Sequence, residues 1–326
     1  MTTLDTASPP QELLETVNEQ TFPVGTRTIA TLPGFLPKRH AWQLFQGSNF
    51  LDSPKTYKEL DTLWQEAKRR SALAPIHLSG FTQTSPKLTQ ITPLPKSVSS
   101  FEQELMSRPT FERWYADTAD YRLWCVPACT LVTPQWYADT GYIEQLAKQA
   151  PQPGQWKEVL DFVFGEGLGI EEPVLCLPNA NTAMAVFRSP ANNLRAIQPP
   201  AEPLQIQRRS AHELEITVRV QTAPNYLQVA RIRGKHVLVN GIRHSCALLK
   251  AGWEVIPCLV REARSLQEVG FAPGQLGLIS ELEEMARPPY ICDFLEHTIA
   301  HTFHQRPVDQ VMRVVVQAES TFVTRM

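Results

Sequence analysis

The chain has 326 residues, of which 43% are apolar and 20% are charged, and its formal net charge is −2. This length allows two ordinary domains or one large domain with extensions, and the apolar fraction suffices for a sizeable core. The near-neutral charge excludes a global basic field of the kind that binds nucleic acid non-specifically, so any phosphate-binding patch must be local.

Apolar runs and cysteines indicate the compartment. No apolar run approaches the ~18 residues needed to span a bilayer, and the N-terminus lacks the basic and apolar regions of a signal peptide. The six cysteines are scattered and most lie in apolar runs, which favours buried free thiols over a disulfide or a zinc site. They are Cys125, Cys129, Cys176, Cys246, Cys258 and Cys292. We therefore expect a cytoplasmic protein with no membrane partner.

The first hundred residues carry many turn signals. Residues 1–50 predict a partly ordered arm that packs through single aromatic side chains such as Phe35, Trp42 and Phe45. Residues 54–71 predict a helix, with Ser53 as its N-cap and Pro54 in its first turn. Residues 83–99 are rich in Thr, Ser, Pro and Lys and form the best candidate linker.

The middle of the chain alternates strand and helix signals. A helix is expected from Phe101. Residues 121–132 then predict a buried strand that is broken at Pro127. Residues 143–150 and 155–164 predict helices. Strand-like runs follow at 174–177 and 184–187, and a proline-rich loop is expected over 188–204. The aromatic-rich segment 111–142 could stack bases, although a core or a domain interface is the more frequent role of such a cluster.

The pattern is densest after residue 205. Strands are expected at 214–220, 227–232 and 236–239, with a short turn at 233–235. A helix over 243–251 stops at Gly252, and a third strand follows at 255–260, where Pro257 favours an edge position. Residues 311–317 predict a final strand. The fold class is thus α+β, a small mixed sheet with flanking helices in residues 205–326, behind a proline-rich N-terminal lobe (1–100) and an α/β intermediate region (101–204).

The candidate site lies where the strand at 236–239 gives way to a helix. Gly241 permits a positive φ or a close backbone approach. The first N–H groups of the helix lack intrahelical partners and lie at the positive end of its dipole, which makes an anion site. The segment expected to line this site is Asn240, Gly241, Ile242, Arg243, His244 and Ser245, and Arg231, Arg233 and Lys235 of the preceding hairpin would join it if the hairpin tip lies close. The alternative is an ordinary glycine turn whose Arg and His are merely solvated.

Residues 237–257, Val-Leu-Val-Asn-Gly-Ile-Arg-His-Ser-Cys-Ala-Leu-Leu-Lys-Ala-Gly-Trp-Glu-Val-Ile-Pro, resemble the core of ParB/sulfiredoxin-like domains. Those domains show an apolar strand, an Asp/Asn-Gly step, a basic pair, an Ala-Leu helix, a glycine and an Ile-Pro strand. The resemblance covers residues 229–260. It implies that the glycine turn and the basic pair hold the phosphates of a nucleotide, and the superfamily includes CTP-hydrolysing partition proteins, sulfinic-acid reductases, serine kinases and nucleases.

The motif departs from the family pattern at position 242. Sulfiredoxins place their catalytic cysteine directly after the glycine, and ParB proteins place a glutamate there, whereas this chain has Ile242. Sulfinic-acid reductase activity is therefore not expected. The basic pair is Arg243-His244, with the arginine first, and this order re-aims both side chains because a helix advances roughly 100° per residue.

Three functions remain open. The first is a binding or regulatory protein that holds a nucleotide or another phosphate-bearing ligand without turnover, with a protein partner also possible. The second is a nucleotide-dependent phosphotransferase or hydrolase, in which a nucleotide with Mg²⁺ is bound by Arg243 and a base is supplied by His244, Glu213 or Glu254. The third is a DNA-binding or nuclease-type protein, which the near-neutral charge disfavours; its basic stripe would be Arg208, Arg209, Arg219, Arg231, Arg233 and Lys235.

A second candidate site lies in residues 293–304. If this segment is helical, Asp293, His297, His301 and His304 share one face, and two histidines four residues apart can chelate a divalent metal. The more frequent outcome for such a pattern is a polar helix face opposite an apolar one.

Overall fold

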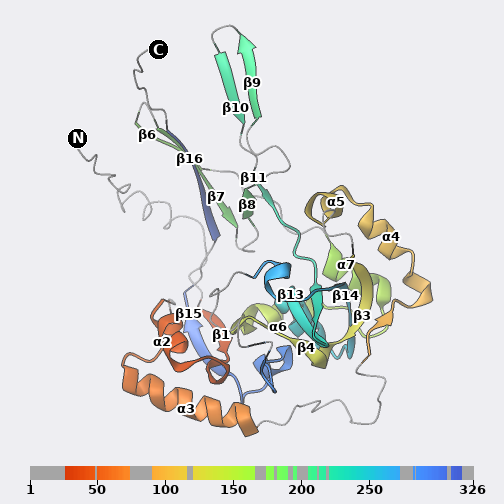
Figure 1. Ribbon diagram of the computed structural model, residues 1–326. Helices are drawn as coiled ribbons and strands as arrows, with labels where there is room; N and C mark the ends of the chain where they lie inside the picture. Colours follow the sequence, from red (N-terminus) through yellow and green to blue (C-terminus); the bar gives the residue numbers. More distant parts are fainter. Residues whose placement is uncertain are drawn as a thin grey trace.

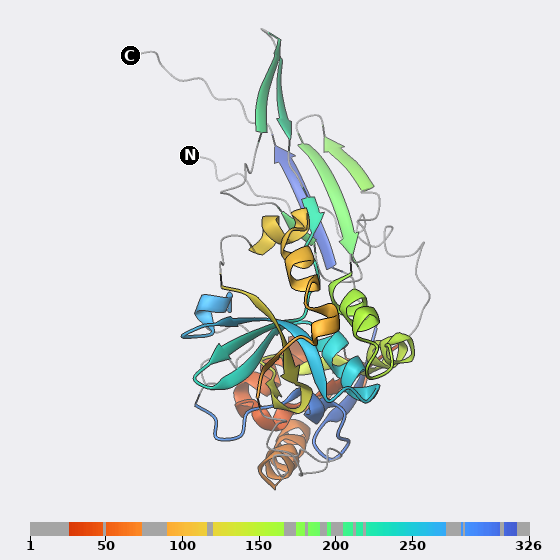
Figure 2. The ribbon, with the colours of Figure 1, turned by 90° about the vertical axis from the view of Figure 1, so that its right-hand side faces the viewer.

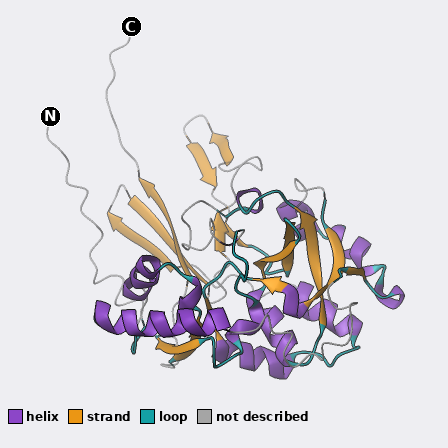
Figure 3. Ribbon diagram, turned by 60° about the horizontal axis from the view of Figure 1, so that its bottom comes forward, coloured by secondary structure: helices purple, strands orange, loops and turns teal. Residues whose placement is uncertain are grey.

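The computed structural model places helices and strands along most of the chain, which confirms the α+β class (Figure 3). The residues that it describes are 26–47, 50–73, 90–115, 120–165, 174–179, 182–189, 194–196, 205–210, 213–217, 220–271, 282, 284–306 and 310–317.

A six-stranded mixed sheet forms the centre of the molecule (Figure 1). Its strands lie in the order β2-β3-β14-β12-β13-β4. Their bounds are Thr92–Pro93 (β2), Arg122–Pro127 (β3), Leu131–Val132 (β4), Gln228–Ile232 (β12), Lys235–Asn240 (β13) and Val255–Glu262 (β14). Strands from the segments 1–100, 101–204 and 205–326 therefore share one sheet.

The strand, turn, strand, helix, strand order expected after residue 226 is present. β12 and β13 form an antiparallel hairpin whose two turn residues, Arg233 and Gly234, both have positive φ (48° and 78°). Two positive φ values are what a type I′ turn requires, and that turn suits the twist of a hairpin. The helix α8 (Ile242–Lys250) then crosses back, so that β14 runs parallel to β12.

α8 stops as the sequence predicts. Gly252 has φ +91°, its N–H donates to Leu249 O (3.0 Å), and the Trp253 N–H donates to Leu248 O (3.0 Å). These two bonds are the pair that defines a Schellman motif, and they satisfy carbonyls that the helix end would otherwise leave unpaired.

The edge position expected from Pro257 is wrong, because β14 lies inside the sheet between β3 and β12. Pro257 is opposite Cys125 of β3, but the pairing of β14 with β12 begins only at Leu259. The proline thus occupies a part of β14 that has one neighbour, so its missing N–H removes no bond from the β12 side.

Both faces of the sheet are covered. Val229 and Leu238 pair across the hairpin and belong to the main core, which also takes in α8 and the helices α6 (Thr140–Gln149) and α7 (Trp156–Phe164). The next pair, Ala230 and Val237, packs on the other face against Leu266, Val269 and Leu282. This alternation is the period-two pattern of strands buried on both sides.

The N-terminal lobe is built on a second sheet, in the order β15-β1-β5. It comprises β1 (Arg27–Thr31), β5 (Tyr137–Asp139) and β15 (His301–Gln305), with the helices α2 (Lys38–Gly47) and α3 (Tyr57–Leu73) beside it. Phe35 and Phe45 are buried as expected, and Trp42 is partly buried. α3 begins later than the sequence suggests, because Thr56 and Glu59 form a reciprocal capping pair in place of Ser53 and Pro54.

Further strands lie above the six-stranded sheet (Figures 1 and 2). β6 (Val174–Asn179), β7 (Thr182–Ser189) and the expected final strand β16 (Gln310–Gln317) form a sheet in the order β16-β7-β6. Two antiparallel strand pairs accompany it: β8 with β11 and β9 with β10. Their bounds are Leu194–Ala196 (β8), Gln205–Ser210 (β9), Glu213–Thr217 (β10) and Val220–Thr222 (β11). Of the expected linker, residues 90–99 contain β2 and a 3-10 turn (Lys96–Val98), and residues 83–89 lie outside the described part.

Most described aromatic side chains of the segment 111–142 pack in the core, and Tyr142 is the exception, at 40% exposed. Tyr115, at the end of α5 (Pro109–Tyr115), stacks on Tyr226 with ring centroids 5.8 Å apart and contacts Tyr121. Trp136 packs edge-on against Phe45 (5.8 Å). A helix does start at Phe101 (α4, Phe101–Met106). The cysteines also behave as expected, since the five whose side chains the structure describes are free and four of these are buried.

Gly241 is the residue whose replacement tests this architecture. Its φ is +95°, and a Cβ built on it would lie 2.9 Å from Leu227 Cα and 3.0 Å from Leu227 Cγ. We expect Gly241→Ala to lower the free energy of unfolding by about 2–4 kcal/mol. The alanine would have to adopt a left-handed backbone conformation, and its Cβ would overlap with the buried residue Leu227.

Gly154→Ala is the matched control for that measurement. Gly154 also has φ +95°, but nothing lies within 4 Å of the point that a Cβ would occupy, so the alanine there meets only the backbone cost of about 1 kcal/mol. Urea denaturation of both variants checks the difference, and equal losses would contradict the contact with Leu227.

Candidate functional site

The start of α8 has the features expected of an anion site. Gly241 occupies the N-cap in a left-handed conformation, and no side chain caps the helix. The first backbone bond of the helix runs from the Ser245 N–H to Gly241 O (2.9 Å). The N–H groups of Ile242, Arg243 and His244 thus precede the intrahelical ladder, where the helix dipole is positive.

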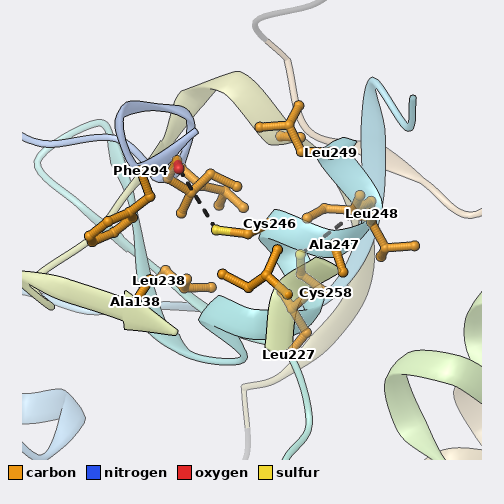
Figure 4. Close-up of a cluster of buried hydrophobic side chains, with 14 of the residues drawn as sticks. Ala138, Leu227, Leu238, Cys246, Ala247, Leu248, Leu249, Cys258 and Phe294 are labelled. Atoms are coloured by element: carbon orange, nitrogen blue, oxygen red, sulfur yellow. Dashed lines mark hydrogen bonds between the residues drawn. The ribbon is translucent and has the colours of Figure 1, made fainter. Parts of the chain in front are cut away.

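The inner face of α8 holds the helix rigidly in place. Cys246, Ala247 and Leu248 are fully buried, and the Cys246 thiol donates to Ile291 O (3.7 Å). Figure 4 shows these side chains among others that come from different parts of the chain, such as Leu238 and Phe294. A helix anchored along one face keeps its N-terminal amides in a fixed position, as a preorganised site requires.

Arg243 is the cation of this site. Its guanidinium carbon lies 5.1 Å from the centroid of the Tyr142 ring, in a cation–π contact. Tyr142 belongs to the first turn of α6, where its N–H donates to the Asp139 carboxylate (2.9 Å), and its side chain is 40% exposed. Within the described part of the chain, no carboxylate lies within ion-pairing distance of Arg243, so its charge is not neutralised there.

His244 points into the protein. Its ring lies edge-on to Phe162, with ring centroids 5.2 Å apart. Burial, and then the neighbouring charge of Arg243, lower the pKa of His244 to about 4. The imidazole is therefore neutral near pH 7 and contributes packing to the site, not charge.

The other residues of the expected motif have structural partners. Asn240 pairs with Gln228 at the end of the hairpin. Ile242 packs against the main core, and the Ser245 hydroxyl donates to Ile242 O (3.0 Å).

Arg231, Arg233 and Lys235 of the β12–β13 hairpin do not lie beside Arg243, so the expectation that they line the same site is wrong. The tip of the hairpin and Gly241 lie at opposite ends of β13, roughly 17 Å apart for a strand of this length. Arg231 forms an ion pair with Glu262 (2.6 Å). The Lys235 ammonium donates to Leu282 O (3.2 Å) and Met285 O (3.0 Å), and Arg233 is exposed in the turn.

Among the described residues, none of the candidate bases His244, Glu213 and Glu254 is placed as an exposed base at the start of α8. His244 is neutral and turned inward. Glu254 is exposed beyond the C-terminal end of α8, a helix about 13 Å long. Glu213 begins β10, and its side chain lies outside the described part of the structure.

The metal site expected from a helix over residues 293–304 does not form. Residues Ile291–Phe294 make a 3-10 turn, His297 is exposed in the following turns, and His301 and His304 lie in β15. Residues three apart in a strand point to opposite faces, so these two histidines cannot share a metal ion. Asp293 pairs with Arg287 (2.8 Å) and His304 with Asp52 (2.8 Å). In the ranges that the structure covers, no group of three or more His, Cys, Asp or Glu could hold a metal.

The expected basic stripe is divided between two regions. Arg208 and Arg209 are exposed on β9, far above the β12–β13 hairpin in both views, and Arg209 forms an ion pair with Glu215 (Figures 1 and 2). Arg219 lies outside the described residues.

Comparison with known proteins adds no homologue. No family model, no curated protein and no solved structure matches this chain. Across the ranges described, no helix combines the length and apolar character needed to cross a bilayer.

Tyr142 is the site residue that sequence reasoning missed. It lies about a hundred positions before Arg243 and meets it only because α6 packs on α8, where Glu144 also pairs with Lys250 (2.9 Å). Nothing in the local pattern of residues 139–142 distinguishes this tyrosine from others in the aromatic-rich segment.

The partly buried imidazole of His244 predicts an acid-sensitive contribution to stability. The pKa of His244 is lower in the folded protein than its ordinary value near 6.5, so stability is full above that value and falls as pH drops from about 6.5 toward 4. His244→Gln should reduce the loss of unfolding free energy between pH 7 and pH 5 by about 2 kcal/mol. Denaturation at both pH values measures it, with the exposed His297→Gln as the control that should leave the loss unchanged.

Proposed function

We propose that this protein binds a phosphate-bearing ligand, with a nucleotide as the first choice, at the start of α8. The observation that carries the proposal is the combination of an uncapped helix N-terminus at Gly241 with Arg243, whose charge has no described carboxylate beside it. Free backbone N–H groups and a guanidinium in the same helix turn favour an anion with several acceptor oxygens.

Tyr142 supports the same proposal. Its contact with the guanidinium limits the rotamers of Arg243, which lowers the entropy lost when a ligand binds. The tyrosine is also partly exposed, so the Arg243–Tyr142 pair lies at the protein surface. The hairpin, glycine turn, helix and parallel strand follow the order of the ParB/sulfiredoxin-like core that the sequence resembles, and nucleotide phosphates are bound at that turn in the family.

Binding without turnover fits the site better than catalysis. The residue after Gly241 is Ile242, where the resembling families carry a reactive glutamate or cysteine. His244 has a pKa of about 4 and packs on Phe162, which makes it a weak base. Glu254 lies beyond the other end of α8.

Thermal denaturation with ATP, CTP and GTP, each with and without Mg²⁺, tests the proposal. A ligand that binds only the folded state raises the unfolding free energy by about 2.7 kcal/mol at a hundredfold excess over Kd. Arg243→Ala should weaken the bound nucleotide about 10- to 100-fold, since it removes a charge-assisted hydrogen bond. Arg208→Ala, which removes an exposed arginine from β9, is the matched control and should keep wild-type affinity.

Two outcomes would contradict the proposal. One is the absence of any shift with nucleotides and with inorganic pyrophosphate. The other is an equal loss of affinity in Arg243→Ala and Arg208→Ala, which would indicate general charge attraction. Release of inorganic phosphate from a nucleotide that binds would show turnover and would favour the phosphotransferase or hydrolase function instead.

A further inference from the structure

Two helices pack on each other at the candidate site, and one of them has a side-chain cap. The first turns of α6 and α8 meet where Tyr142 contacts Arg243. In α6 the Asp139 side chain accepts a hydrogen bond from the Tyr142 N–H (2.9 Å) and so caps the helix. α8 has Gly241 at the equivalent position and no side-chain cap. The order of the first turn of α6, which carries Tyr142, therefore depends on Asp139.

Asp139 is anchored in the sheet β15-β1-β5. It lies at the end of β5, opposite Ile29 of β1, and is 8% exposed. The hydroxyl of the next residue, Thr140, donates to Thr28 O (2.9 Å). The Arg27 side chain, at the start of β1, lies 3.9 Å from the Asp139 carboxylate. β1 thus holds both the backbone and the charge of the residue from which α6 starts.

We propose that Asp139 is a positioning residue of the anion site, acting through Tyr142 on Arg243. This inference rests on the proposed function, because it concerns the same site. Without its cap the first turn of α6 frays, since its N–H groups have no intrahelical partners. The Tyr142 ring, whose centroid lies 5.1 Å from the Arg243 guanidinium, then no longer limits the rotamers of that arginine. Arg243 loses more rotamer freedom when an anion binds, and the affinity falls.

The charge of Asp139 alone predicts the opposite effect. A carboxylate near an anion site repels the ligand, and Arg27 offsets part of that charge from 3.9 Å away. If charge were all that mattered, any neutral residue at position 139 would tighten anion binding. Asparagine and alanine remove the same charge, but the asparagine side chain keeps an oxygen that accepts from the Tyr142 N–H. These two substitutions therefore separate the cap from the charge.

Titration calorimetry of the full-length protein with inorganic pyrophosphate compares the two variants. Asp139→Ala should raise Kd about 2- to 5-fold, a factor comparable to the strength of an exposed cation–π contact. Asp139→Asn should bind at least as tightly as wild type. Equal Kd values for the two variants would overturn the proposal.

Thr56→Ala is the matched control for the loss of a helix cap. The Thr56 hydroxyl accepts from the Glu59 N–H (3.2 Å) at the start of α3, a helix that does not border the site. This variant loses a cap of the same kind and should keep the wild-type Kd for pyrophosphate. A rise in Kd equal to that of Asp139→Ala would indicate a general effect of helix fraying and would contradict the positioning role.

A double-mutant cycle with Tyr142→Leu identifies the route. Tyr142→Leu should itself weaken pyrophosphate binding by a similar factor. Asp139→Ala should add no further loss in that background, because the ring on which the cap acts is gone. An equal loss with and without the Tyr142 ring would overturn the proposal.

Failure of the positioning role is distinguishable from failure of the anion site. A wild-type protein that binds neither pyrophosphate nor a nucleotide would overturn the anion site, and this inference with it. Wild-type protein that binds pyrophosphate, together with an unchanged Kd in Asp139→Ala, would overturn the positioning role of Asp139 alone.

Discussion

The contact between Gly241 and Leu227 determines where α8 lies, and most of the molecule depends on that helix. The chain turns from β13 into α8 with a left-handed residue that lies directly against a buried backbone, a position that only glycine fills without strain. The buried face of α8 then meets α6 and the Ile291–Phe294 turn. The Schellman end at Gly252 then returns the chain as β14 beside β12.

The same contact changes how the glycine is interpreted. In nucleotide-binding turns, a glycine often allows the ligand to approach the backbone closely. Here the approach is made by Leu227, so the glycine by itself gives no information about a ligand. An anion is favoured instead by what the turn leaves exposed: the first amides of α8 and the guanidinium of Arg243 above Tyr142.

Sequence reasoning was most successful where the decisive contacts are local. The hairpin, the glycine turn, α8 and β14 follow from periodicity and turn residues within forty positions, and the free cysteines follow from their apolar neighbours. It was wrong where a distant segment decides the outcome. Pro257 is tolerated because β12 starts late, which no property of residues 255–260 reveals. The end of the histidine-rich segment forms the strand β15, which pairs with β1, so the helical spacing assumed for residues 293–304 does not apply there. Of the candidate site, Arg243 was foreseen and Tyr142 was not, since helix packing alone brings them together.

The pairing of β1 with β15 has a consequence for the way the protein is made. Thr31 donates to the carbonyl of His301, which lies 270 positions later. On the ribosome, β1 emerges long before its partner, so the N-terminal lobe has an open sheet edge until the C-terminal segment has left the exit tunnel. Domains normally fold in order as they emerge, and contacts between distant segments slow that process. A chain that is truncated before residue 301 therefore lacks one of the two strands that pair with β1 and keeps only β5 beside it.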